Sequence, residues 1–258
     1  MGTVVCMSPD LTLSGLWSSA PPSREVLTPL VLAEHPPAVR WLLAHALPLG
    51  SPLPTAVHLR MHGEIKLKRW FPFTAEQVIV QGRGMVWEAK VHMSGLPIRG
   101  WDRLVDGRGA MRWSLFGLLP VLRAANEDVT RSARGRARAE SLWLPSLFAD
   151  PTLRWRPKED RRVRVCLPPL DQPGGDPESL ELNLGPSGQI RTISVARWGQ
   201  PEGGTYREEP FGAQVEAEGT FDGLTIPTSL RAGWWPGTPR FEREGEFFRC
   251  EVTEARFR

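Results

Sequence analysis

The spacing of apolar side chains changes twice along the chain, and these changes predict its elements. Residues 1–34 show no regular period, so we expect an irregular N-terminal arm there. Residues 36–45 carry apolar side chains at helical spacing, with proline at the start, which predicts a short amphipathic helix acting as a lid or plug. From residue 55 onward apolar and polar residues alternate, as is typical of strands with one solvated face.

The alternating segments in the first half of the chain predict antiparallel hairpins. They cover residues 55–62, 74–81, 85–93, 97–105 and 109–116. The third segment alternates most cleanly and places Met85, Trp87 and Met93 on its inner face. Asp106 and Gly107 predict a tight turn between the last two segments, because this pair readily adopts positive φ angles.

Residues 126–148 form the one long segment with helical spacing, and we expect a helix that begins near Asn126. Its basic residues are predicted to face outward, and Trp143 to face inward. These basic residues are Arg131, Arg134 and Arg138. Glu140 lies between the basic and the apolar part of the segment, so its environment is the central question of function.

The second half of the chain again reads as strands joined by short turns, which predicts an antiparallel meander. The segments are 153–156, 162–167, 179–184, 189–198, 213–221, 224–234 and 247–257, and residues 168–177 are predicted to be a loop. Two strand-rich halves around one helix favour a mainly β (α+β) fold. We expect one large curved antiparallel sheet, an open half-barrel wrapped around a central helix, forming a single domain over residues 35–258.

Composition adds one unusual feature to an otherwise ordinary chain. The 258 residues are 41% hydrophobic with a net charge of +3, which gives little reason to expect a nucleic-acid partner or stable membrane insertion. The 11 tryptophans predict a cavity with aromatic walls. The candidate ligand-binding residues are Met85, Trp87, Met93, Trp101, Trp113, Arg136, Trp143 and Trp198.

The cysteines and histidines carry no metal-binding pattern. Cys6, Cys166 and Cys250 are too far apart in sequence for a metal motif or a disulfide framework, and the five histidines lack ligand spacing. We therefore expect no metal and no cofactor. Neither a secretory leader nor a long apolar run is evident, so a cytoplasmic location is expected, while the oligomeric state stays open.

Candidate chemistry centres on two carboxylates and one arginine. Arg136 and Glu140 are four residues apart on the predicted helix and can pair, either as a structural ion pair or as a ligand-contacting or catalytic site. Asp102 can join Glu140 for acid/base chemistry if its strand faces the helix. The chain has no Gly-x-Ser-x-Gly elbow and no phosphate-binding loop, which argues against a nucleophilic hydrolase or a nucleotide-binding protein.

Several segments resemble an uncharacterised bacterial family, a domain of unknown function, from about residue 36 to the C-terminus. They are residues 63–77, 86–89, 106–109 and 139–145. The resemblance implies the curved half-barrel of the LolA and LolB lipoprotein carriers, with an apolar concave pocket. Arg136 and Glu140 match the family pattern. The chain departs from it at Ala137 and Arg138, where an aromatic-aliphatic pair is expected, and at Phe211, where Trp is expected.

Two functional hypotheses are preferred over a third, an RNA-binding module, because no known nucleic-acid motif is present. The first is binding of an apolar small molecule, a lipid or a polyketide-like compound, in a cavity lined by Trp and Met. The second is a cofactor-independent cyclase or isomerase that uses the same pocket, with Glu140 or Asp102 as the acid/base. A sealed pocket with Glu140 pointing into it favours the enzyme, and an open groove with Glu140 tied to Arg136 favours a carrier.

Overall fold

Thirteen antiparallel strands form one sheet in the part of the chain that the computed structural model describes, residues 12–93, 95–158, 161–168 and 178–258. The first half supplies β1 (Ala56–Lys66), β2 (Trp70–Val80), β3 (Gly84–Met93), β4 (Leu96–Val105), β5 (Arg108–Leu115) and β6 (Leu119–Ala124). The second half supplies β7 (Arg154–Pro157), β8 (Arg162–Leu167), β9 (Glu178–Leu184), β10 (Ile190–Gly199), β11 (Arg207–Phe221), β12 (Leu224–Trp234) and β13 (Glu246–Phe257).

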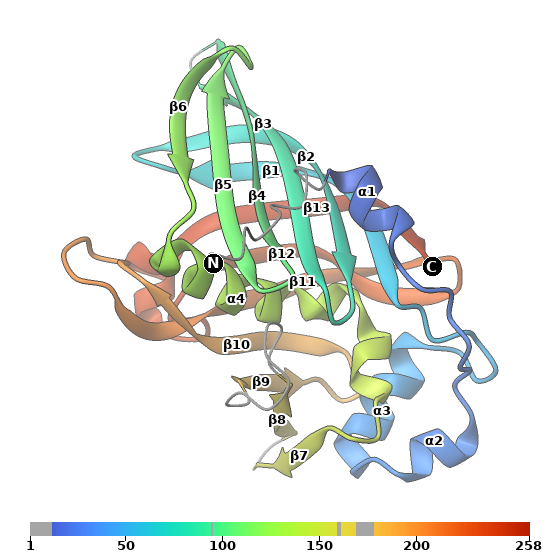
Figure 1. Cartoon of the computed structure of the whole chain (residues 1–258). Helices are drawn as coiled ribbons and strands as arrows, with labels where there is room; N and C mark the ends of the chain where they lie inside the picture. Colours follow the sequence, from blue (N-terminus) through green and yellow to red (C-terminus); the bar gives the residue numbers. More distant parts are fainter. Residues whose placement is uncertain (1–11, 94, 159–160, 169–177) are drawn as a thin grey trace, which may run out of the picture.

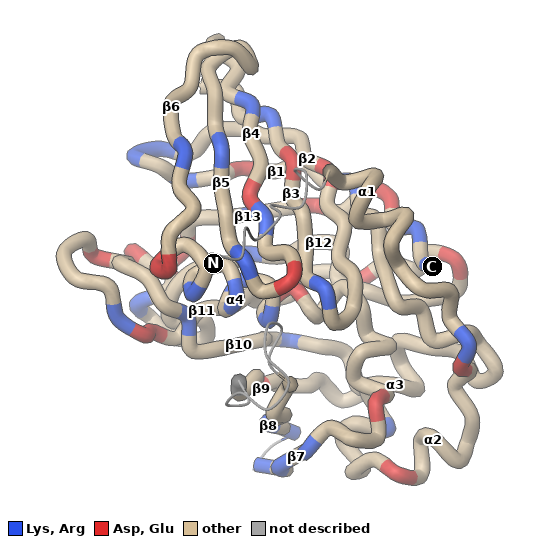
Figure 2. Tube along the Cα trace, viewed as in Figure 1, with Lys and Arg blue, Asp and Glu red and all other residues tan. Residues whose placement is uncertain are grey.

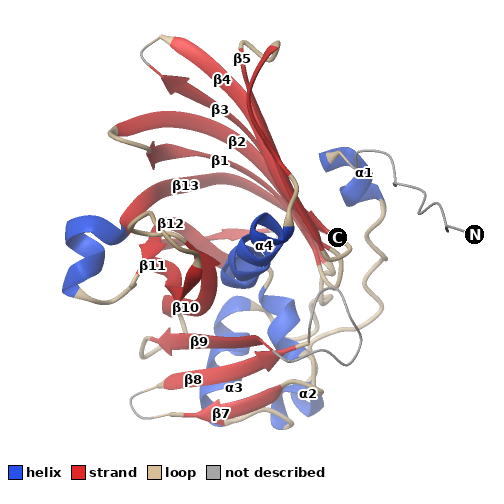
Figure 3. Ribbon diagram, turned by 60° about the vertical axis from the view of Figure 1, so that its left-hand side comes forward, coloured by secondary structure: helices blue, strands red, loops and turns tan. Residues whose placement is uncertain are grey.

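The strand order shows how one helix comes to cross the sheet. Strand β1 pairs with both β2 and β13, so each half of the chain extends outward from the centre by hairpins. The two edge strands, β6 and β7, are consecutive in sequence. The chain passes from one edge to the other through α4 (Glu127–Ala139), which lies on the concave side of the curved sheet (Figures 1 and 3). The predicted single curved sheet around a central helix is confirmed.

Helix α4 begins as predicted but ends early. The Asn126 side chain caps it by accepting a hydrogen bond from the Val129 amide at 2.9 Å. The helix ends at Ala139, and two 3₁₀ turns follow, η1 (Glu140–Trp143) and η2 (Pro145–Ala149), so the predicted helix over residues 126–148 is too long. Pro145 explains part of the difference, because proline lacks an amide donor and disfavours helical backbone in the residue before it.

Two of the predictions for the helices need correction. The arm predicted to be irregular contains α1 (Leu13–Ser18) and α2 (Pro29–Ala33), which are too short to leave a periodic signal. Helix α3 (Pro37–Ala46) forms where predicted, but it packs its apolar face into the core beside β8 and β12 and contributes no residue to the cavity described below. It is therefore a core helix and not a lid.

One strand was missed by the sequence pattern, and one predicted loop lies largely outside the described residues. Residues 119–124 form strand β6, which the pattern did not predict because the segment does not alternate and contains Pro120. Proline is tolerated there because β6 is an edge strand and needs fewer amide donors. Most of the loop predicted at residues 168–177 lies outside the described residues. In the whole described part of the chain, no helix is long and apolar enough to cross a membrane.

The cysteines differ in their access to solvent. Cys250 on β13 is 4% exposed, and burial together with the nearby negative charge of Glu140 raises the pKa of its thiol. Cys166 on β8 is only partly buried, and Cys6 lies outside the described residues. The two described thiols should therefore react at different rates.

With Cys6 replaced by Ser, we expect iodoacetamide at pH 9 to alkylate Cys166 while Cys250 stays unmodified. A raised pKa keeps the Cys250 thiol protonated at a pH where an ordinary thiol is largely the reactive thiolate. Peptide mass spectrometry after timed quenching measures both rates, and the same reaction in urea is the control, since both thiols should react once unfolded. Equal rates in the folded protein would contradict the burial of Cys250.

Candidate functional site

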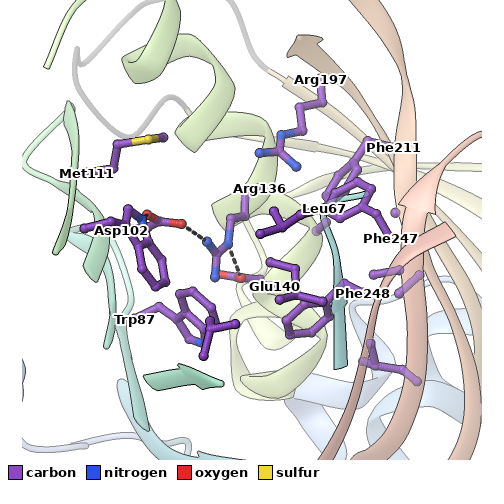
Figure 4. A pocket seen from close by; sticks show the side chains of 18 of the residues that line it. Leu67, Trp87, Asp102, Met111, Arg136, Glu140, Arg197, Phe211, Phe247 and Phe248 are labelled. Atoms are coloured by element: carbon purple, nitrogen blue, oxygen red, sulfur yellow. Dashed lines mark hydrogen bonds and ion pairs between the residues drawn. The ribbon is translucent and has the colours of Figure 1, made fainter. Parts of the chain in front are cut away.

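A cavity of about 430 Å³ lies between the concave face of the sheet and α4 (Figure 4). Its volume falls within the range of small-molecule sites. Its walls are largely aromatic and aliphatic, and the aromatic side chains are Trp87, Trp113, Trp143, Phe211, Phe247 and Phe248. Four charged side chains also line it, Asp102, Arg136, Glu140 and Arg197. The cavity thus combines an apolar surface with one group of charges.

Strand geometry explains how the aromatic wall forms. Alternation along β3 sends Trp87, Val91 and Met93 to the concave side. Phe247 and Phe248 are adjacent on β13 and would point to opposite faces of a regular strand. Between β12 and β13 the register shifts near Phe247, a β-bulge that allows both rings to line the cavity.

The aromatic rings form a connected cluster around Trp87. Its ring centroid lies 5.8 Å from that of Phe73, 5.8 Å from that of Trp113 and 6.2 Å from that of Phe248, in tilted or edge-on arrangements. Such arrangements place the positive edge of one ring near the negative face of another. The guanidinium carbon of Arg136 lies 4.8 Å from the centroid of the Trp87 ring, which links the cluster to the charged groups.

Arg136 connects the two carboxylates of the cavity. Its Nη1 donates to Asp102 Oδ2 at 2.8 Å, and its Nε donates to Glu140 Oε1 at 2.7 Å (Figure 4). The other Glu140 oxygen accepts from Gln77 Nε2 at 2.6 Å, and the other Asp102 oxygen accepts from Trp113 Nε1 at 2.9 Å. Burial alone would lower the pKa of Arg136, but the two carboxylates outweigh burial and raise it.

Seven of the candidate residues lie beside the cavity. They are Trp87, Met93, Trp113, Trp143, Arg136, Asp102 and Glu140. The condition for a role of Asp102, that its strand faces the helix, is met, and Arg136 bridges the two carboxylates. Whether these residues bind a ligand or take part in a reaction stays a prediction.

Three other candidate residues lie away from the cavity, and Arg138 does not face outward. Met85 is buried at the other end of β3. Trp101 alternates with Asp102 and therefore faces the convex side, where Arg103 lies over its ring. Trp198 stacks on Tyr206 and donates to Asp128 near the start of α4. Arg138, predicted to face outward, is 4% exposed, because its side chain turns to the Pro168 carbonyl.

Arg197 on β10 was missed by the sequence analysis. Its Nε donates to the Ser132 carbonyl of α4 at 3.1 Å, and its guanidinium carbon lies 4.2 Å from the centroid of the Phe211 ring. Strand alternation contained the signal, because Ile193 and Val195 are buried and Arg197 occupies the next position on the same face. Burial and the positive charge of Arg136 lower the pKa of Arg197 to about 10.

Gly135 explains how α4 can approach this strand. A Cβ atom at residue 135 would lie 2.8 Å from Cγ of Arg197, so any larger residue would push the helix away from β10. Glycine normally destabilises a helix when it lies in the helix interior. Here it allows the aliphatic stem of Arg197 to pack against the helix backbone, which fixes the direction of the guanidinium.

Fold and site together define a protein with one curved antiparallel sheet and an apolar cavity beneath a crossing helix. The chain belongs to the family of unknown function DUF6544, whose sequence profile matches residues 25–242. Membership of an uncharacterised family, predicted from the sequence, is thus confirmed. Of the two departures from the family pattern, Phe211 lines the cavity, whereas Ala137 and Arg138 do not.

Two solved structures are similar in outline. One is a domain described as an outer membrane lipoprotein-sorting protein from Vibrio parahaemolyticus, with 10% identity, a TM-score of 0.40, and coverage of 79% of this chain and 85% of that one. The other is a LolA superfamily protein from Nitrosomonas europaea, with 9% identity, a TM-score of 0.39, and coverage of 91% and 94%. Comparison with curated proteins gives no significant match.

Proposed function

We propose that this protein binds an apolar small molecule, such as a lipid or a polyketide-like compound, in the cavity beneath α4. The observation that carries the proposal is the lining itself, in which six aromatic rings and several aliphatic side chains surround about 430 Å³. Filling such a surface with an apolar ligand removes it from water, which is the main favourable term in binding of this kind.

The hairpin of β5 and β6 offers a route into the cavity. Val121 and Leu122 line the cavity and are also 59% and 46% exposed to solvent. Leu118, at the tip of the same hairpin, is 83% exposed and does not line the cavity. The apolar wall therefore continues to the outer surface, where an apolar ligand could first make contact.

We expect Leu122→Glu to weaken binding of the uncharged fluorophore N-phenyl-1-naphthylamine at least about tenfold, because a carboxylate beside an apolar ligand loses hydration without gaining a partner. The control is Leu118→Glu, which adds the same charge to the same hairpin outside the cavity. Fluorescence titration measures both affinities. Thermal unfolding should show little change for either variant, since both positions are exposed.

The proposal fails if the wild-type protein does not bind the fluorophore, or if both variants weaken binding equally. Equal weakening would place the binding site on the outer face of the hairpin and not in the cavity. A tenfold difference between two variants with the same charge supports the cavity.

The alternative, a cyclase or isomerase with Glu140 or Asp102 as the acid/base, has less support. All four oxygens of these carboxylates already accept a hydrogen bond from Arg136, Gln77 or Trp113. A general base must come within hydrogen-bond reach of the substrate proton, and each of these oxygens has one of its two lone pairs engaged already. The engaged oxygens and the exposed hairpin at the cavity edge favour a binding protein over a sealed reaction chamber.

A further inference from the structure

We propose that the ligand carries a single anionic headgroup, a carboxylate or a phosphate on an apolar chain, and that Arg197 binds this headgroup inside the cavity. This inference rests on the proposed function and adds the chemical class of the ligand. It follows from a difference between two arginines: Arg136 pairs with two carboxylates, whereas Arg197 pairs with none in the described part of the chain.

The Arg197 guanidinium has less than its full set of partners. Its Nε donates to the Ser132 carbonyl, whereas neither terminal nitrogen has a hydrogen-bond acceptor within the described ranges. No carboxylate among those residues lies within ion-pair distance of it. Figure 4 shows its side chain pointing toward the neighbouring Arg136, with Phe211 nearby, and both arginines line the cavity. The terminal N–H groups are therefore available to a molecule in the cavity.

The carboxylates of the cavity compensate this charge only in part, because neither pairs with Arg197 directly. Asp102 and Glu140 both pair with Arg136, at 2.8 and 2.7 Å, and their remaining oxygens accept from uncharged donors. Both carboxylates act on Arg197 from a distance and raise the pKa of its guanidinium, but burial and the charge of Arg136 outweigh them and lower it to about 10. Arg197 is still protonated at neutral pH, so it presents a positive charge.

The surroundings of Arg197 favour an anion over a neutral polar group. Its guanidinium carbon lies 4.2 Å from the centroid of the Phe211 ring and 5.4 Å from that of the Trp234 ring, and the residue is partly buried, so water solvates the charge less well than at the surface. An unpaired charge in an apolar setting is costly, and an oxyanion from the ligand would remove that cost. The planar guanidinium also matches carboxylate and phosphate oxygens, which accept two parallel hydrogen bonds from it.

The position of Arg197 suits a ligand with one charged end. Its stem packs closely against the α4 backbone at Gly135, and its Nε donates to the Ser132 carbonyl. These two contacts orient the guanidinium before any ligand enters. The aromatic cluster around Trp87 and Phe248 lies along the same cavity and would contact the apolar chain. A preorganised cation beside an apolar wall selects an amphiphile with an anionic headgroup.

Displacement of bound N-phenyl-1-naphthylamine tests the inference with three ligands of equal chain length, all below their critical micelle concentrations at pH 8. They are tetradecanoate, tetradecyl phosphate and tetradecanol. We expect at least one of the two anions to bind about 10- to 100-fold more tightly than the alcohol, in line with a charge-assisted hydrogen bond in an apolar site. The two anions together distinguish a carboxylate from a phosphate headgroup, and inorganic phosphate alone should displace nothing.

Substitution of Arg197 tests whether the preference for anions over the alcohol depends on this side chain. Arg197→Met should remove most of the preference for the anion and leave the affinity for tetradecanol within about threefold. Arg197→Lys should keep part of the preference, because it keeps the charge but not the planar donors. The matched control is Arg131→Met, since the Arg131 guanidinium lies over Trp198 outside the cavity and should not affect any of the ligands.

The outcomes separate this inference from the proposed function. If the fluorophore binds but both anions bind no more tightly than the alcohol, the anionic headgroup is excluded and the apolar cavity stands. If neither the fluorophore nor any ligand binds, the proposed function itself fails. Arg197→Gln can still donate to the Ser132 carbonyl and replaces Arg197→Met if that variant does not fold. An unchanged anion preference in either neutral variant would overturn the role of Arg197.

Discussion

Arg136→Met is expected to lower the free energy of unfolding by about 3–5 kcal/mol, because it leaves two half-buried carboxylates without their cation. Asp102 and Glu140 each accept a hydrogen bond from Arg136, at 2.8 and 2.7 Å. Without the guanidinium, the two negative charges that now flank it would repel each other in a poorly solvated setting. Urea unfolding followed by tryptophan fluorescence measures the loss.

Glu140→Gln is the matched control for Arg136→Met. It removes one charge but leaves Arg136 paired with Asp102, and the new amide can still accept from Arg136 or Gln77. We therefore expect a clearly smaller loss of stability than for Arg136→Met. Stability losses in the reverse order would mean that the ion pairs do not hold α4 to the sheet.

The same Glu140→Gln variant tests the acid/base alternative. If ligand binding is unchanged while the unfolding midpoint falls, Glu140 is structural. A reaction on an apolar substrate that disappears in this variant, with its fold and binding intact, would restore the catalytic hypothesis. The hydrogen bonds to both oxygens of Glu140 lead us to expect the structural result.

Trp87→Ala is expected to cost about 3–5 kcal/mol, because it removes a large buried ring from the centre of the aromatic cluster. Trp87 is 2% exposed and contacts Phe73, Trp113 and Phe248, so three neighbouring rings would each lose a partner. The variant would also join new empty volume to the cavity. The midpoint of urea unfolding reports the loss, and fluorophore titration reports the change in the cavity.

Trp87→Phe is the control for this second result. The Trp87 indole nitrogen has no hydrogen-bond partner among the described residues, so a phenyl ring loses packing area but no hydrogen bond. We expect a much smaller loss of stability than with alanine. If the two variants lose the same free energy of unfolding, the indole nitrogen contributes to stability in a way that the packing of the rings does not explain.

Local pattern was enough to predict most of the sheet. The Asp106-Gly107 turn has the positive φ angles, 48° and 77°, that its sequence requires, and it joins the two strands expected on either side. Asn126 caps α4 because its side chain reaches an amide three residues on. Predictions of this kind succeed because the interactions that decide them lie within a few residues of each other.

Three candidate residues lie away from the cavity for a different reason. Trp101 and Trp198 were chosen for residue type and Met85 for its strand face, and neither signal tells which part of the sheet forms the cavity. Trp101 lies on the convex face, Met85 packs in the core at the other end of β3, and Trp198 packs beside the start of α4. Phe247 reaches the cavity through a bulge, which strict alternation cannot predict.

Local sequence was sufficient for most of the strands, the turn at Asp106-Gly107, the start of α4 and the pairing of Arg136 with Glu140, because helical and strand spacing bring those groups together locally. Only the tertiary structure decided that Asp102 joins this pair and that Arg197 faces the cavity without a carboxylate partner in the described part of the chain. Both facts depend on how far the sheet curves around α4. That curvature arises from register and packing across thirteen strands, which no local pattern in the sequence contains.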